Sequence, residues 1–151
     1  MIPKPVELPH TWRPFGARLV GTVLGVMLLA LTLAVWIAFG PDVRSRFTVF
    51  QKSTLVFLGL LALSVWFALM RSRVTADANG VVVVNGYRKR TLAWAEVIAV
   101  NLRRGAPWAG MDLSDGTSIS ALAIQASDGE RAKQAVRDLR RLVVENTPTA
   151  G

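Results

Sequence analysis

The sequence predicts an α-helical membrane hairpin followed by a small α+β domain, in which one C-terminal helix covers a bent antiparallel sheet. Three observations predict this organisation. Two long segments, 19–40 and 53–70, are apolar and contain no charged residue. Short segments rich in β-branched residues, separated by turn residues, fill the chain after residue 70. From Ser127 onward the apolar residues recur at helical spacing.

The two apolar segments are long enough to cross a bilayer. The chain has 151 residues, of which 52% are hydrophobic. As helices, 19–40 and 53–70 reach about 33 and 27 Å, against a hydrocarbon core of about 30 Å. Segment 19–40 exceeds the apolar core of a signal peptide, and a second apolar run follows closely. We therefore expect a two-span hairpin over residues 19–70, joined by the connector 41–52.

The positive charges predict the orientation of this hairpin. Residues 1–18 carry three Lys or Arg and residues 71–90 carry five, against three in the connector. Because Lys and Arg near the spans are retained in the cytoplasm, we expect both termini there, in a plasma (inner) membrane protein with 1–18 as a cytoplasmic tail. The net charge of +8 is explained by this flanking of the spans, so no nucleic-acid partner is expected.

Small residues in the first span suggest close helix packing. Gly21 and Gly25 form a GxxxG step. This step fits either packing against the second span of the same chain or contact with a second copy or another membrane protein, and the sequence leaves both readings open.

Six short segments after residue 70 predict the antiparallel sheet: 73–77, 81–85, 87–94, 97–103, 108–113 and 117–124. Residues that tolerate positive φ separate several of them, at 78–80, 85–86 and 114–116. Alternation places Ile98, Val100 and Leu102 on one face, which we expect to pack against the core.

The C-terminal helix is amphipathic. Its predicted buried stripe consists of Ala132, Ala135, Val136, Leu139, Leu142 and Val143. Ser127 and Glu130 have the spacing of a capping box, and Asp128 adds a negative charge suited to a helix N-terminus. We expect the helix to end near Glu145 or Asn146, before a loose tail at 147–151.

Three sequence elements resemble a known family. They are VTADANGVVVVNG at 74–86, the step Trp94-Ala95-Glu96-Val97, and the turn DLSDGT at 112–117. Together they resemble small bacterial membrane proteins with a pleckstrin-homology (PH) domain, of the actinobacterial low molecular weight protein antigen type. The resemblance implies a PH-like sheet or barrel of six or seven strands over 71–146. In such a domain we expect Trp94 to close a strand against the core, and Glu96 to accept hydrogen bonds from turn amides.

The chemistry-bearing residues do not predict an enzyme. The chain has no cysteine and one histidine, His10, so a nucleophile lacks its usual base. Asp112 and Asp115 flank a predicted turn and lack the pattern of a calcium loop. We expect no catalytic site, metal or cofactor. The predicted function is a membrane-anchored PH-like interaction or scaffold module, and the alternative is an accessory subunit of a membrane transport or envelope-biosynthesis complex.

Two basic segments are candidate contacts for anionic lipid headgroups or an acidic protein partner. One is Arg88-Lys89-Arg90, and the other is Arg103-Arg104 with nearby Trp108. In a strand, alternation sends Lys89 to the face opposite Arg88 and Arg90, so these three form no single patch unless the backbone is bent. The competing interpretation of both segments is a solvated surface.

Overall fold

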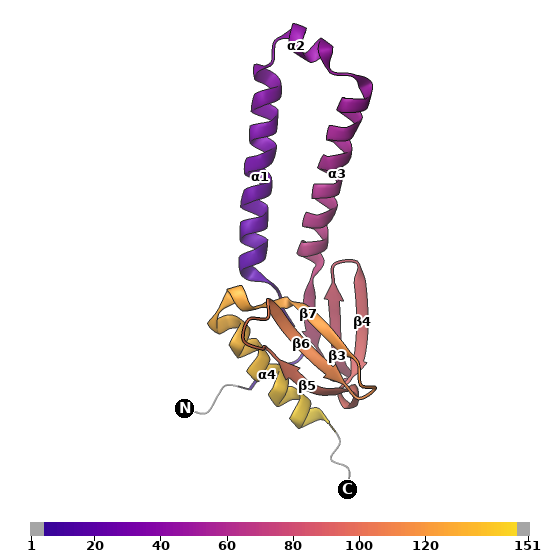
Figure 1. Ribbon diagram of the computed structural model, residues 1–151. Coiled ribbons are helices and arrows are strands. Elements are labelled where there is room, and N and C mark those ends of the chain that lie inside the picture. Colours follow the sequence, from indigo (N-terminus) through magenta and orange to yellow (C-terminus); the bar gives the residue numbers. More distant parts are fainter. Residues whose placement is uncertain (1–4, 148–151) are drawn as a thin grey trace.

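In the computed structural model, which describes residues 5–147, two long apolar helices stand on a β-rich domain (Figure 1). Helix α1 spans Phe15–Ala38 and helix α3 spans Val49–Arg71. Both are long and apolar enough to cross a membrane, at about 36 and 35 Å. Neither contains a buried residue, so their apolar side chains form the surface that a bilayer would cover.

A short helix, α2 (Pro41–Arg46), lies in the connector at the far end of the hairpin (Figure 1). Arg44 closes the end of α1, because its guanidinium donates to the carbonyls of Phe39 and Ile37, each at 2.7 Å. Thr48 and Gln51 form a reciprocal capping box at the start of α3. The connector therefore contains the residues that cap the end of α1 and the start of α3.

The two long helices contact each other close to the domain. The indole N–H of Trp66 donates to the Thr22 hydroxyl at 3.1 Å. A Cβ built at Gly21 would lie 3.1 Å from the Leu69 side chain, whereas one built at Gly25 would meet nothing within 4 Å. Only the first glycine of the GxxxG step thus packs within the hairpin.

Two antiparallel sheets form the domain, and their strand orders are β1-β2-β3-β4 and β5-β6-β7. The strands are β1 (His10–Trp12), β2 (Arg73–Ala76), β3 (Gly80–Asn85), β4 (Arg88–Ala93), β5 (Val97–Asn101), β6 (Trp108–Leu113) and β7 (Ser118–Gln125). Single-turn helices η1 (Trp94–Glu96) and η2 (Ala126–Asp128) follow β4 and β7, and α4 (Glu130–Asn146) is C-terminal. The predicted order of six strands and a final helix is confirmed, and a seventh strand is added.

The seventh strand, β1, comes from the segment before the first long helix, so the expectation that residues 1–18 form only a tail is wrong. It pairs antiparallel with β2, with His10 opposite Ala76 and Trp12 opposite Val74. The hydroxyls of Thr11 and Thr75 add a side-chain hydrogen bond of 3.0 Å. The chain therefore begins the sheet, leaves through the hairpin, and returns to complete it.

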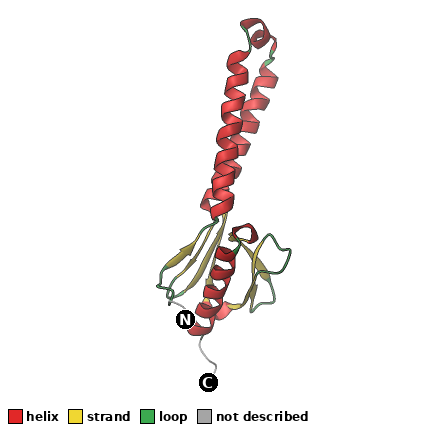
Figure 2. Ribbon diagram, turned by 90° about the vertical axis from the view of Figure 1, so that its left-hand side faces the viewer, coloured by secondary structure: helices red, strands yellow, loops and turns green. Residues whose placement is uncertain are grey.

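The core lies between the sheets and under α4, which crosses the open side of the domain (Figure 2). Asn85 joins the sheets, since its side chain donates to the Ser120 carbonyl and accepts from the Leu122 amide. The predicted stripe of α4 is confirmed, because all six of its residues are buried: Ala132, Ala135, Val136, Leu139, Leu142 and Val143. The helix ends at Asn146 as predicted, whereas residues 148–151 of the expected tail lie outside the described part.

The alternation predicted for β5 is wrong at its start. Ile98 is 64% exposed, whereas Val97 and Val100 are buried. The register between β5 and β6 shifts between Val97 and Ala99. This bulge adds a residue to β5 and turns Ile98 outward, which a strict period of two does not anticipate.

The predicted capping box at the start of α4 is also wrong. Gly129, with φ of +58°, precedes the helix, and no side chain caps it. Ser127 lies in η2, where its hydroxyl is 3.5 Å from the Gln125 side chain. Gly129 supplies the positive φ that the sharp entry into α4 needs. Asp128 does bond to a helix N-terminus, but that helix is α1.

The expectations for the Trp94–Val97 step are confirmed. Trp94 is buried, and its indole N–H donates to the Asp77 carbonyl at 3.1 Å. The Glu96 carboxylate accepts from the Ala93 amide at 2.6 Å. β5 then begins at Val97.

Candidate functional site

The first junction between the domain and the long helices is made by Asp128. Its two carboxylate oxygens accept from the backbone amides of Phe15 and Gly16, at 3.1 and 2.8 Å. These amides lie in the first turn of α1, where the helix itself offers no acceptor and the dipole favours a negative charge. The start of α1 is therefore fastened to the end of η2.

The second junction joins the turn between β3 and β4 to the end of α3. The Tyr87 hydroxyl lies 2.7 Å from the Ser64 hydroxyl and 2.9 Å from the Ser64 carbonyl. Gly86 has φ of +60°, and a Cβ there would be 3.2 Å from the Ala68 Cβ. Glycine thus permits both the turn and the close approach to the helix. The two junctions determine which side of the domain faces the helices.

The candidate residues on β4 are exposed but do not point together. Arg88, Lys89 and Arg90 pair with three successive residues of β3, and β4 is the outer strand of its sheet. Arg88 adjoins the turn that touches α3. Arg90 lies toward Asp115 in the β6–β7 hairpin, where hydrogen bonds from Thr117 and then the Arg90 charge lower the pKa of the Asp115 carboxyl. A strand edge carrying three basic residues also resists pairing with other strands.

The other candidates lie on the loop between β5 and β6. Arg103 and Arg104 are exposed, in a turn that has Gly105 at φ of +85°. Trp108, 40% exposed, is the first residue of β6. The Ala126 amide donates to the carbonyl just before Trp108 at 2.9 Å, so the end of this loop lies beside η2, whose Asp128 bonds to the start of α1. The structure therefore places the two candidate groups on different elements.

The carboxylates of the β6 hairpin are engaged within the sheet. Asp112 accepts from the Asn101 amide at 2.9 Å and from the Ser118 hydroxyl at 2.6 Å. Asp115 accepts from the backbone amide and hydroxyl of Thr117. Within residues 5–147, no three His, Asp or Glu residues are close enough to hold a metal ion. The arrangement around Asp112 and Asp115 is that of a hydrogen-bonded hairpin.

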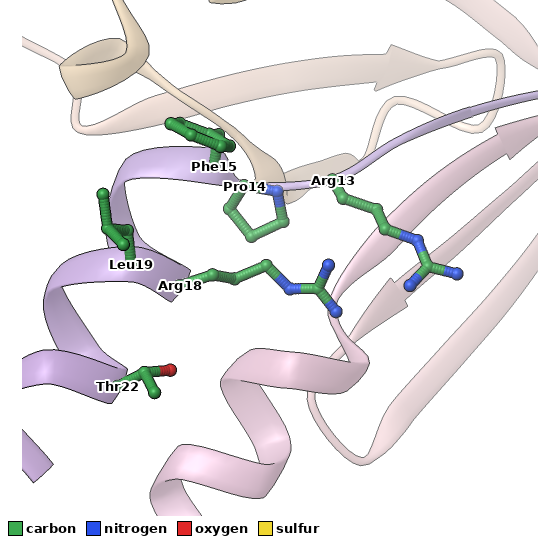
Figure 3. A pocket seen from close by; sticks show the side chains of 6 residues that line it. All are labelled: Arg13, Pro14, Phe15, Arg18, Leu19 and Thr22. Atoms are coloured by element: carbon green, nitrogen blue, oxygen red, sulfur yellow. The ribbon is translucent and has the colours of Figure 1, made fainter. Parts of the chain in front are cut away.

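Arg13 and Arg18 are not among the predicted site residues, although both belong to the basic residues that predict the orientation. They line an open pocket at the start of α1, shown in Figure 3. The available signal was two basic residues on either side of Pro14, directly before an apolar span. Their convergence depends on β1, which fixes the direction of the chain before α1.

Comparison with known proteins agrees with the observed architecture. The family model described as "Bacterial PH domain" matches residues 71–142. The chain is 33% identical over 143 residues to the uncharacterized protein Rv1417 of Mycobacterium tuberculosis and to the uncharacterized protein Mb1452 of Mycobacterium bovis. Each alignment covers 93% of this chain and 88% of the relative. No solved structure matches the chain.

Proposed function

Because the chain belongs to the bacterial PH-domain family, we propose that it is a membrane-anchored interaction module without catalytic activity of its own. The observation that carries this proposal is the direct attachment of the PH-like domain to both apolar helices, through Asp128 and Tyr87. A domain attached at two points keeps one side toward the bilayer and presents the other sides to partners. Recruitment is not needed, because the helices already hold it at the membrane.

In this proposal, 19–70 is the membrane hairpin, 71–146 is the PH-like domain, and both termini are cytoplasmic. The eight Lys and Arg on the domain side, against three in the connector, support this orientation. The pairing of β1 with β2 gives further support, because it keeps residues before α1 and after α3 on the same side of any membrane that the helices cross.

The basic residues on the helix side of the domain suit anionic headgroups. Arg103 and Arg104 lie on the loop that ends beside η2, which bonds to the start of α1, and Arg88 adjoins the turn that contacts α3. Attraction of about 1 kcal/mol per basic residue near an anionic surface would orient a domain that is already tethered. We therefore expect salt-sensitive contact with anionic lipids and no preference for one phosphoinositide.

A fluorescent probe on single cysteines tests this contact, because the chain has no cysteine of its own. Ala106→Cys places the probe on the β5–β6 loop. Ser114→Cys is the matched control, because β7 runs about 25 Å from the Ser114 hairpin to η2. In nanodiscs with a quencher on the headgroups, the probe at 106 should be quenched more strongly than the probe at 114. The difference should grow with anionic lipid and shrink at high salt.

Charge removal completes the experiment. Replacing Arg103 and Arg104 with Ser should reduce quenching at 106 in anionic nanodiscs. Equal quenching at both probe positions, or quenching insensitive to lipid charge and salt, would contradict headgroup contact. If replacing Arg88, Lys89 and Arg90 with Ser leaves the salt dependence of probe quenching unchanged, that segment is a solvated strand edge.

The exposed apolar sides of α1 and α3 favour a second function, an accessory subunit of a larger membrane complex. Gly25 and Gly59 have open space where a side chain would stand, and small residues on a span allow another helix to approach closely. Purification in mild detergent tests this function. A transport or envelope-biosynthesis protein recovered in fixed stoichiometry supports the subunit, whereas recovery of the chain alone supports the independent module.

A further inference from the structure

An open pocket of about 380 Å³ lies where the N-terminal segment enters α1. The segment before the helix and the first turns of α1 form its walls: Arg13, Pro14, Phe15, Arg18, Leu19 and Thr22. Figure 3 shows the side chains of Arg13 and Arg18 extending to the same side of the helix start, toward the end of α3. The pocket therefore combines two cations with an apolar wall.

The two arginines are not neutralised by the chain. No ion pair within 4 Å joins either of them to a carboxylate in residues 5–147. The nearby carboxylate of Asp128 is already bonded to the first amides of α1. Two guanidinium groups without a counter-ion attract an anion that can accept hydrogen bonds from both, and phosphate matches their donor geometry.

The hydrogen bonds of Arg18 leave donors available. One terminal nitrogen of Arg18 donates to the Met70 carbonyl at the end of α3. Its Nε is buried and has no partner among the described atoms. An arginine has five N–H donors, and a buried donor without an acceptor is costly. The buried Nε is closed to groups from outside the chain, but the guanidinium has terminal N–H donors besides the one bonded to Met70, and an outside acceptor would meet those.

The depth of the pocket points to a lipid. Arg18 directly precedes the uncharged segment 19–40, so in a membrane it stands where hydrocarbon gives way to headgroups. The headgroup layer is only about 5–8 Å thick on each side, so the pocket and the lipid phosphates share one level. Leu19 also lines the pocket, and it begins the uncharged segment that acyl chains would surround.

We propose that Arg13 and Arg18 bind the phosphate of one anionic phospholipid in this pocket. The inference rests on the proposed function, in that it requires α1 and α3 to cross the membrane. Arg18 provides the fixed donor beside α3, and Arg13 closes over the phosphate from the segment that follows β1. A bound lipid would thereby join the N-terminal strand, α1 and the end of α3.

Lipid retention by the full-length protein tests the proposal. The protein is purified in mild detergent, incubated with equal amounts of phosphatidylglycerol and phosphatidylcholine, and analysed by native mass spectrometry. We expect one phosphatidylglycerol to be retained in preference. The double variant Arg13→Gln, Arg18→Gln should bind it about thirtyfold more weakly. The matched control, Lys133→Gln with Arg137→Gln, removes the same charge on the exposed side of α4 and should keep the preference.

Two further measurements distinguish a lipid phosphate from a soluble one, and loss of binding from loss of folding. Displacement of the lipid by millimolar inorganic phosphate would assign the pocket to a soluble anion and overturn the lipid proposal. Arg13→Gln alone removes no hydrogen bond found in the structure, so lost retention in this variant cannot be attributed to misfolding. Unchanged retention in both the single and the double variant would overturn the proposal.

Extraction of membranes with alkaline carbonate measures insertion of the protein independently of lipid binding. Release of the wild-type chain into the soluble fraction would contradict the proposed function. Stable insertion without a preference for phosphatidylglycerol would refute only the lipid pocket.

Discussion

Leu139 lies in the middle of α4 with no exposed surface, in the cluster that joins the helix to both sheets. Truncation to alanine removes buried methyl groups and leaves a cavity that the surrounding strands fill only partly. Val144 lies on the same helix and is 78% exposed. Leu139→Ala therefore tests whether α4 closes the core, and Val144→Ala is the matched control.

The expected cost follows from this burial. Fully buried Leu→Ala changes cost about 2–5 kcal/mol, and small domains have about 5–15 kcal/mol of stability. Because the PH-like domain is small, each kcal/mol shifts its thermal midpoint by about 4–8 °C. A loss of about 3 kcal/mol thus corresponds to a fall of about 12–24 °C. Val144→Ala should change stability by less than about 0.5 kcal/mol.

Amide hydrogen exchange on the full-length protein in detergent, recorded as the temperature rises, measures this change in the domain itself. Protection in β5, β6 and β7 should be lost at a lower temperature in Leu139→Ala, whereas α1 and α3 keep theirs. A midpoint within about 2 °C of wild type for Leu139→Ala would refute the packing argument. So would an equal fall for Val144→Ala.

Three further outcomes are expected. Tyr87→Phe removes the hydroxyl that bonds to Ser64, so amide exchange in the β3–β4 turn should accelerate by about tenfold or less; an unchanged rate would contradict the junction. Asp128→Ala removes the cap of α1 and should cost about 1 kcal/mol of stability, measured as faster amide exchange in the first turn of α1. Asp128→Asn keeps one acceptor oxygen and should cost less stability. Thr117 lowers the pKa of Asp115, so the resulting stability is present above the ordinary carboxyl pKa of about 3.9 and is lost as pH falls through the lower folded value. Asp115→Asn should weaken this acid dependence, measured as the thermal midpoint against pH, and an identical profile would contradict the assignment.

The parts of the fold that depend on local pattern were predictable. Turn residues bound the strands, and the spacing of Leu139 and its neighbours defines the buried stripe of α4. The roles of Trp94 and Glu96 were also predictable, because their partners lie within the adjoining turns and strand.

The parts that depend on distant partners were not predictable. The three-residue strand β1 has no periodicity of its own, and it forms because β2, more than 60 residues away, offers an edge. Asp128 has the composition of a local cap but bonds to amides at 15 and 16, over 110 residues away. The outward turn of Ile98 results from a bulge whose register depends on β6.

The candidate site was predictable in composition and not in arrangement. Arg103 and Trp108 are exposed, Arg103 on the loop between β5 and β6 and Trp108 at the first residue of β6. The run from Arg88 to Arg90 is divided by strand alternation, as expected. The pocket at Arg13 and Arg18 needs the strand pairing of β1 before its geometry exists.

Single cysteines introduced into the otherwise cysteine-free chain report on which side of the membrane each part of the protein lies. Ser45→Cys lies in the connector helix α2, and Ser114→Cys lies in the β6–β7 hairpin of the PH-like domain. With a membrane-impermeant maleimide, we expect labelling of position 45 in intact cells and of position 114 only in inverted vesicles. Labelling of position 114 in intact cells, or of both positions from the same side, would contradict a hairpin that holds the domain at the cytoplasmic face.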